Sequence, residues 1–435
     1  MSLSKSPARR NPLDREILGL ALPTLGALVA EPLFLLVDTA LVGHLGDTTL
    51  AGLAIASVIL QTAVGLLVFL AYATTPAVAR LIGAGDRPGA LRAGLDGMWL
   101  ALAVGAVLLV AGVLFGPAAV AAFGGSEAVT QQAATYLVIS ALGIPGMLLV
   151  LAGTGLLRGL QDARTPLVIV GVGFAANAVL NVVFIYGLGW GIAGSAIGTV
   201  VAQWGMAVWF VLRIVRLAHG VPLGPRLAGF SVAAASGGWL FVRTISLRIA
   251  ILLTFAAATQ QGVTELAALQ VGIALYSLLA FILDSLAIAG QAMIGHGLGV
   301  GDRTRVRAIS RRLIRFGLLA GLAIGVVIAA LSPVLGAVFT SDPAVRAQLV
   351  PVVLVLAIAL PLSGFVFVLD GVLIGAGDGR YLAITGIVNV VCYLPLLWFS
   401  LGSFTLLWMA FCVGYIGLRA LTLGLRVRGE AWLRT

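Results

Sequence analysis

The chain contains two copies of one pattern, separated by a constant offset of 216 residues. The tripeptide Gly85-Asp86-Arg87 recurs as Gly301-Asp302-Arg303, and no gap is needed over about residues 46–164 of the first copy. The same offset joins further single residues: Pro117 to Pro333, Phe123 to Phe339, Pro145 to Pro361, Gly159 to Gly375, Asp162 to Asp378 and Arg164 to Arg380. A repeat of this kind predicts that one structural unit is built twice.

The composition indicates what the repeated unit is. Of the 435 residues, 61% are hydrophobic and 10% are charged. A helix of about 20 apolar residues crosses a hydrocarbon core roughly 30 Å thick, and apolar runs of that length fill nearly the whole chain. We therefore expect an all-α integral membrane protein with twelve transmembrane helices. The predicted spans are 17–43, 50–75, 90–115, 128–157, 166–188, 191–213, 238–259, 266–291, 313–338, 346–374, 381–401 and 403–425.

Six spans in each copy return the chain to its starting side, so the two copies have the same orientation and form parallel repeats. The longest polar connection lies between the copies and contains Pro222, Pro225 and Arg226. We predict an N-lobe over 1–215, a cytoplasmic interlobe linker over 216–235 and a C-lobe over 236–435. Prolines within spans allow bends, and Pro23, Pro32 and Pro145 are the positions concerned in the N-lobe.

The distribution of charge predicts the topology. The net charge is +10, but the arginines are spread over short connections rather than gathered on one soluble face, so we expect no nucleic-acid partner. Basic residues concentrate on alternate connections, while the other connections carry Asp47, Glu127, Glu265 and Asp342. The positive-inside rule then places both termini in the cytoplasm. We expect a multi-pass monomer of the cell (inner) membrane whose macromolecular surroundings are the lipid bilayer.

Several kinds of catalytic site are missing from the sequence. The only lysine is Lys5, so a Walker A phosphate loop cannot be present, and neither HExxH nor GxSxG occurs. We therefore predict that the protein is not an enzyme and has no cofactor.

Four carboxyl groups lie within predicted spans, where an ionised acid needs a partner, a wet cavity or a proton. They are Glu31, Asp38, Asp284 and Asp370. The offset of 216 places Thr254 at the position of Asp38 and Thr154 at the position of Asp370, so the acids are not duplicated. We expect Asp284 and Asp370 to line a cavity of the C-lobe, either as functional acids or as satisfied structural groups.

The first span carries the strongest functional pattern. Glu31 and Asp38 are seven residues apart and share a helix face, with Pro32 between them; Pro23 and Pro32 are the predicted helix hinge. Burial disfavours the ionised form of Asp38, and binding of a proton or Na⁺ would remove that penalty.

Neutral polar side chains accompany this acid. Asn177 and Asn181 lie one turn apart, and Thr199 follows in the next span. Their oxygens suit a hydrogen-bonded proton or a hard cation, so the predicted coupling ion is H⁺ or Na⁺, with a possible Na⁺ site at Asp38, Asn177 and Asn181. The same asparagines are often interhelical hydrogen-bonding groups without a ligand role.

Five motifs together resemble the multidrug and toxic compound extrusion (MATE) family, DinF-type branch, over about residues 14–425. The motifs are DTALVGHLG from Asp38 to Gly46, the Asn177 and Asn181 pair followed by FIYGLGWGIAGSAIGT from Phe184 to Thr199, LDG from Leu369 to Gly371, LDS from Leu283 to Ser285, and the pair Arg243 and Arg248. Their order and spacing carry the resemblance together with the duplication.

This resemblance implies a V-shaped transporter whose two six-helix lobes alternate access and export organic, often cationic, small molecules in exchange for H⁺ or Na⁺. Asp38 matches the coupling acid of the family's first span. Tyr136, Asn177, Asn181 and Thr199 match the polar cluster around it, and Asp370 matches an acid found in span 10 of some branches. Archaeal relatives have an aspartate where this chain has Asn181, and the missing charge favours proton coupling.

Two rival functions remain. A flippase for a lipid-linked precursor, or another exporter of the wider MOP group, would need basic side chains for a pyrophosphate, and arginines are sparse within the spans. Arg243 and Arg248, at the start of a span, suggest headgroup anchors more than substrate ligands. A channel would need a continuous polar pore, whereas the acids here are isolated in different spans.

Overall fold

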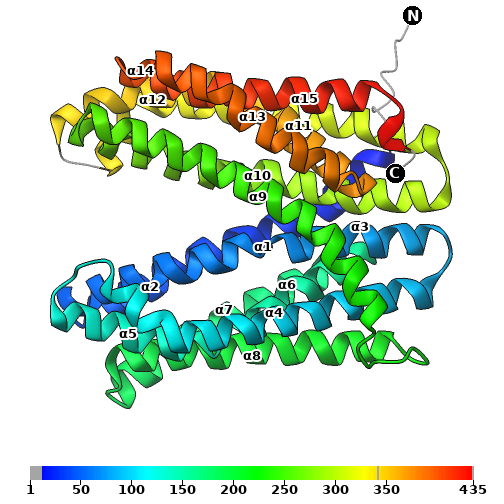
Figure 1. Ribbon diagram of the computed structural model, residues 1–435, viewed down its shortest axis with the longest axis horizontal. Coiled ribbons are helices and arrows are strands. Elements are labelled where there is room, and N and C mark those ends of the chain that lie inside the picture. Colours follow the sequence, from blue (N-terminus) through cyan, green and yellow to red (C-terminus); the bar gives the residue numbers. More distant parts are fainter. Residues whose placement is uncertain (1–11, 340–341, 434–435) are drawn as a thin grey trace, which may run out of the picture.

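The computed structural model describes residues 12–339 and 342–433, and these fold almost entirely into helices (Figure 1). Lys5, the first eleven residues of the predicted N-lobe and the last two of the predicted C-lobe lie outside the described residues. The first half contains α1 (Pro12–Gly43), α2 (Asp47–Leu66), α3 (Phe69–Gly83), α4 (Arg87–Ala121), α5 (Glu127–Ala141), α6 (Ile144–Gly159), α7 (Arg164–Val182), the π-helical turn η1 (Val183–Gly187) and α8 (Gly191–Leu217). The second half contains α9 (Leu227–Gln261), α10 (Val263–Val300), α11 (Arg303–Phe339), α12 (Pro343–Ala376), α13 (Gly379–Phe399), α14 (Phe404–Met409), the π-helical turn η2 (Ala410–Tyr415), α15 (Ile416–Arg428) and the short 3₁₀ turn η3 (Ala431–Leu433).

Within the described residues, eleven helices or helix runs are long and apolar enough to cross a membrane. The bent pair α5 and α6 raises this number to twelve when it is counted as one span. The chain is therefore a multi-pass membrane protein, and the predicted all-α fold class is confirmed.

Two breaks interrupt these spans. The angle between α5 and α6 is 50°, and Pro145 lies in the first turn of α6, as expected from a residue that cannot continue a helix ladder. A second break separates α2, which ends at Leu66, from α3, which begins at Phe69. No proline accompanies it, so the sequence did not predict it. In contrast, α1 runs as one helix through both of its internal prolines.

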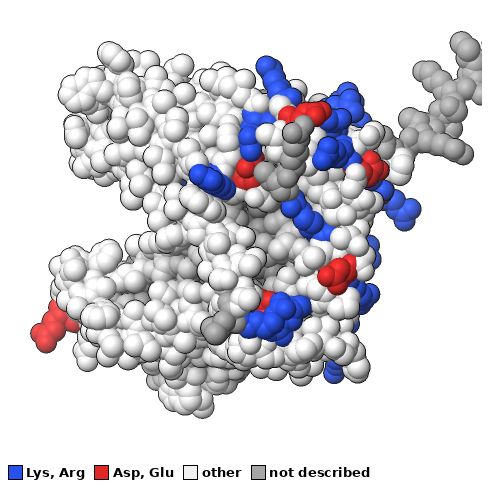
Figure 2. Space-filling view, turned by 45° about the vertical axis from the view of Figure 1, so that its right-hand side comes forward, with Lys and Arg blue, Asp and Glu red and all other residues white. Residues whose placement is uncertain are grey.

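The helices form two lobes that meet along one side and separate toward the other. In Figure 1 the lower lobe contains α1 to α8 and the upper lobe α10 to α15, while α9 starts beside the lower lobe and ends in the upper one. Figure 2 shows the resulting hollow between the lobes. The Arg side chains that Figure 2 shows gather at the opposite end of the molecule, the end at which Figure 1 marks the N- and C-termini. The V shape implied by the sequence is therefore present.

The internal repeat recurs in the packing of the two lobes. A Cβ atom built on Gly159 of α6 would lie 2.8 Å from the carbonyl oxygen of Thr75 in α3. In the second copy, a Cβ atom on Gly375 of α12 would lie 2.8 Å from the carbonyl oxygen of Gln291 in α10, and both residues are 216 positions later. Glycine allows helices to approach this closely, so the same helix contact is built once in each lobe.

The connection between the lobes is shorter than the range 216–235 expected from the sequence. Helix α8 continues to Leu217 and α9 begins at Leu227, because the residues after Pro225 contain no further helix breaker. The remaining connection is fixed to the N-lobe: Arg92 of α4 donates hydrogen bonds to the carbonyls of Pro222 and Gly224. The first part of α9 thus belongs structurally to the N-lobe.

Candidate functional site

Asp38 lies in a polar pocket inside the N-lobe and is 3% exposed. Its carboxylate accepts hydrogen bonds from Asn181 Nδ2 of α7 at 2.7 Å, from Ser195 Oγ of α8 at 2.6 Å and from Tyr136 Oη of α5 at 3.3 Å. The three donors come from three different helices. The fold of the whole lobe therefore decides the environment of this acid.

Each of these helices presents its polar residues at helical spacing. Asn177 and Asn181 lie one turn apart on α7, and Ser195 and Thr199 lie one turn apart on α8. Each pair therefore lies on one face of its helix, and these two faces meet where α7 packs against α8. Asn177 Nδ2 donates to Thr199 Oγ1 at 3.1 Å, which extends the network by one turn. Packing continues beyond the polar groups, where Phe34 of α1 stacks on Phe174 of α7 with ring centroids 4.8 Å apart.

The electrostatics of the pocket are unusual because the three donors to Asp38 are all uncharged. They satisfy hydrogen bonds of an ionised carboxylate but supply no counter-charge. A carboxylate removed from water in this way favours uptake of a proton or a cation. The amide oxygens of Asn177 and Asn181 are also buried, and neither finds a hydrogen-bonding partner among the described residues.

The second lobe has no acid at the matching place. Thr254 takes the position of Asp38, and its hydroxyl lies 2.8 Å from the hydroxyl of Tyr393, the residue at the position of Asn177. Both side chains are neutral and buried. The duplicated scaffold therefore holds one charged pocket rather than two.

The structure brings together Asp38, Tyr136, Asn177, Asn181 and Thr199, five of the residues singled out from the sequence. It adds Ser195, which the sequence reasoning passed over, although its spacing of one turn from Thr199 was a usable signal. Glu31 is not part of the network: it lies two turns before Asp38 on α1 and is exposed.

A cavity of about 460 Å³ lies next to the pocket, at the end of the N-lobe away from the arginines. Its wall includes Thr135, adjacent to Tyr136 in α5, and Ile192, one turn before Ser195 in α8. The polar side chains of Thr49, Gln131 and Gln132 also line it. Water in this cavity would stand one helix turn from the donors to Asp38.

Asp370 is in a different electrostatic state from Asp38. It is 5% exposed and forms ion pairs with Arg243 of α9 and Arg419 of α15. The expectation of a cavity-lining acid is therefore replaced by a buried ion triad. Arg243 is part of that triad rather than a headgroup anchor, because α9 lies against α13 and turns this arginine inward.

Asp284 lies at the seam between the lobes. Tyr72 of α3 donates a hydrogen bond to its carboxylate at 3.0 Å, so the contact joins the N-lobe to α10. Arg158 of α6 is buried within electrostatic range of both residues, and its Nε finds no hydrogen-bonding partner in the described part of the chain. This acid thus belongs to an interlobe contact.

The comparisons with known proteins cover most of the chain. The MatE family model matches residues 23–183 and 240–399. The DNA damage-inducible protein F of Escherichia coli K12 is 30% identical over 94% of this chain and 91% of its own length. The Arabidopsis thaliana protein DETOXIFICATION 43 is 28% identical over 95% of this chain and 90% of its own length.

Solved structures share the fold. The Vibrio cholerae MATE transporter VcmN in its bent form superposes with a TM-score of 0.89 at 21% identity, covering 97% of this chain and 98% of that one. A MOP superfamily transporter from Pyrococcus furiosus superposes with a TM-score of 0.88 at 20% identity, covering 98% of both chains. At these identities the likeness concerns the fold.

Proposed function

Because the chain belongs to the MatE family of multidrug and toxic compound extrusion transporters, we propose that it is a secondary active antiporter that exports organic, often cationic, compounds in exchange for H⁺. One observation carries this proposal. Asp38 is buried among three neutral hydrogen-bond donors that bring no counter-charge. A group in this setting changes its proton occupancy when its surroundings change.

The direction of transport follows from the charge distribution. Arginines gather at the end of the molecule that carries the termini, and the positive-inside rule assigns that end to the cytoplasm (Figure 2). The hollow between the lobes then opens to the outside of the cell (inner) membrane. In this arrangement the cavity lined by Thr135 and Ile192, which neighbour Tyr136 and Ser195 in sequence, lies on the outer side of the N-lobe, the side from which we propose that the proton enters.

The coupling step uses the neutralisation of this acid. A proton from outside binds Asp38 and weakens the attraction of the three donors for the carboxylate. Helix α1 then bends at Pro23 and Pro32, the pocket narrows, and the compound leaves toward the outside. Coupling requires that the two protonation states favour different lobe arrangements, since equal preference would shift nothing. Release of the proton to the cytoplasm resets the protein.

Protons rather than Na⁺ fit the orientation of Asn181. Its amide nitrogen donates to Asp38, whereas its unpaired oxygen lies against Gly198 of α8. A bound Na⁺ would need that oxygen turned toward the carboxylate. In the present arrangement Asn181 directs an N–H donor rather than an oxygen ligand at the carboxylate, so its side chain does not contribute to a cation site there.

The test is transport in liposomes containing the purified protein, with an imposed pH gradient and a panel of fluorescent dyes. Asp38→Asn should abolish proton-driven export while the protein stays folded. Asp47→Asn is the matched control, because Asp47 is exposed at the start of α2. Normal export by Asp38→Asn would disprove the role assigned to Asp38. Export driven by a Na⁺ gradient at constant pH would show that Na⁺, and not H⁺, is the coupling ion.

The flippase for a lipid-linked precursor is the alternative, and buried Arg158 is the observation that favours it. A pyrophosphate group needs several cationic partners. Arg243 and Arg419 both pair with Asp370, so these two arginines share one negative charge and are already engaged by a carboxylate. Adding lipid-linked pyrophosphates to the same liposomes separates the two functions, since only a flippase would move them without a pH gradient.

A further inference from the structure

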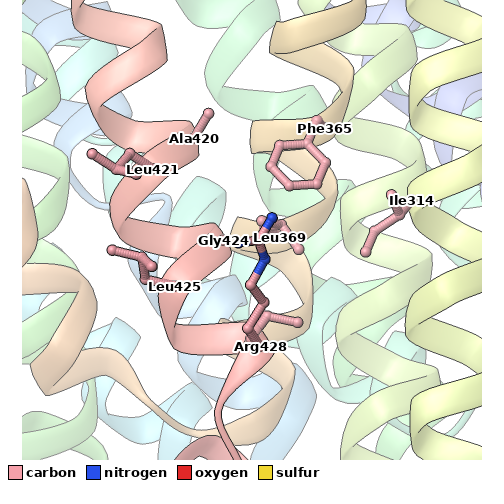
Figure 3. A pocket seen from close by; sticks show the side chains of 9 residues that line it. Ile314, Phe365, Leu369, Ala420, Leu421, Gly424, Leu425 and Arg428 are labelled. Atoms are coloured by element: carbon pink, nitrogen blue, oxygen red, sulfur yellow. The ribbon is translucent and has the colours of Figure 1, made fainter.

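A pocket of about 320 Å³ lies on the C-lobe between α11, α12 and α15 (Figure 3). None of the helices that form the Asp38 site in the N-lobe contributes to its lining. Its lining is apolar apart from one arginine: Ile314, Phe365, Leu369, Ala420, Leu421, Gly424, Leu425, Val427 and Arg428. Leu421 and Leu425 of α15 are 59% and 57% exposed, so the wall of the pocket continues onto the surface that faces the bilayer. A hydrocarbon chain is the natural filling of such a groove.

The pocket contains one arginine, Arg428. Figure 3 shows the Arg428 side chain pointing into the pocket, and no described residue forms an ion pair with it. It lies in the last turn of α15, at the arginine-rich end where lipid headgroups would stand. A guanidinium group beside apolar walls, at the level of the lipid headgroups, is complementary to a headgroup phosphate.

A second arginine, Arg311, precedes the one lining residue that α11 contributes to the pocket. Arg311 of α11 is exposed and lies one turn before Ile314, on the face that lines the pocket. Glu430, the acid that follows α15, is engaged by Arg307. The entrance therefore has a surplus of positive charge above an apolar groove.

We propose that this groove is a binding site for an anionic phospholipid of the surrounding membrane, with one acyl chain along Leu421 and Leu425 and the headgroup phosphate on Arg428 and Arg311. Basic pockets between transmembrane helices on the cytoplasmic side bind acidic headgroups for the same reason. The site differs from the export pathway in place and in chemistry, so its occupancy does not depend on the proposed antiport.

Native mass spectrometry of the delipidated full-length protein tests the proposal. Titration with phosphatidylglycerol and with phosphatidylcholine of the same acyl chains should show tighter binding of the anionic lipid. Arg428→Gln should weaken phosphatidylglycerol binding about fivefold, and Arg428→Gln combined with Arg311→Gln about 25-fold, with phosphatidylcholine unchanged. Arg428→Lys, which keeps the charge, should retain most of the preference.

Two further variants locate the bound lipid. Arg213→Gln removes another exposed arginine near the end of α8 and should leave the titration unchanged. Gly424→Leu should remove one bound lipid of either kind, since a Cβ atom there meets only Phe365, at 3.6 Å, and a larger side chain fills the groove. Unchanged phosphatidylglycerol binding in the double variant, an equal loss in Arg213→Gln, or an unchanged lipid count in Gly424→Leu would overturn the proposal.

Discussion

The same chemical change, aspartate to asparagine, should have opposite consequences at Asp370 and Asp38. Asp370 forms ion pairs with both Arg243 and Arg419 in a buried triad. Its replacement leaves two desolvated guanidinium groups without a negative partner, and removing one member of a buried pair costs about 3–5 kcal/mol. At Asp38 the donors are neutral, so asparagine loses about one hydrogen bond, worth about 1 kcal/mol, and removes a buried charge. The net change there should be close to zero.

Thermal unfolding in detergent, followed by intrinsic fluorescence, measures this difference. A shift of about 2–4 °C per kcal/mol applies to domains of about 150–250 residues, which is the size of one lobe. Asp370→Asn should therefore lower Tm by about 6–20 °C, and Asp38→Asn by less than about 4 °C. Arg419→Met added to Asp370→Asn should restore part of the loss, because it removes one of the two orphaned cations.

The outcome discriminates between two electrostatic descriptions. A small shift for Asp370→Asn would mean that the triad is not formed in the folded protein. An equally large shift for Asp38→Asn would mean that the acid has a cationic partner in the membrane. The second result would also remove the basis for the coupling role, because a permanently paired carboxylate does not exchange a proton.

Two further substitutions test contacts between neighbouring helices. Gly325→Ala should destabilise the C-lobe by about 1–3 kcal/mol, because the new Cβ atom would lie 2.5 Å from the carbonyl oxygen of Ala357. Gly205→Ala, with open space around its Cβ position, is the control, and equal Tm values for the two variants would contradict the packing argument. Tyr72→Phe removes the hydrogen bond to Asp284 between the lobes and should shift the equilibrium away from the arrangement described here at least about tenfold. Distances between spin labels on the α4–α5 and α13–α14 connections measure this shift, and an unchanged distance distribution would show that this contact does not hold the lobes.

Much of the architecture could be predicted from the sequence because it depends on local and periodic properties. Apolar runs of membrane length predicted the number of spans, and the bend between α5 and α6 lies at Pro145, one of several prolines that were expected to allow a bend. The cluster around Asp38 was also accessible, because Asn177 and Asn181 share a helix face. Ser195 was missed although it lies one turn before Thr199, and the structure identifies it through its hydrogen bond to Asp38.

The remaining features required contacts between residues far apart in the chain. The state of Asp370 depends on Arg419, which is 49 positions later, and on Arg243, which is 127 positions earlier. Glu31 shares a helix face with Asp38 by spacing, but the other helices build their polar pocket around Asp38 alone. The spacing of residues along one helix specifies the direction in which their side chains point. The residue that each side chain meets on the neighbouring helix is decided by how the helices pack.

The sequence by itself determined that this chain is a duplicated helical membrane protein with one copy of each intramembrane acid. The length of the apolar spans, the repeat of 216 residues and the distribution of charge depend only on the order of residues along the chain. Only the tertiary structure decided which of those acids lies among neutral hydrogen-bond donors and which lies among cations. Asp38 meets three neutral donors and Asp370 meets two arginines. In a medium of low dielectric constant, the nearest side chains across a helix seam dominate the free energy of a charge, and those neighbours are brought together by folding.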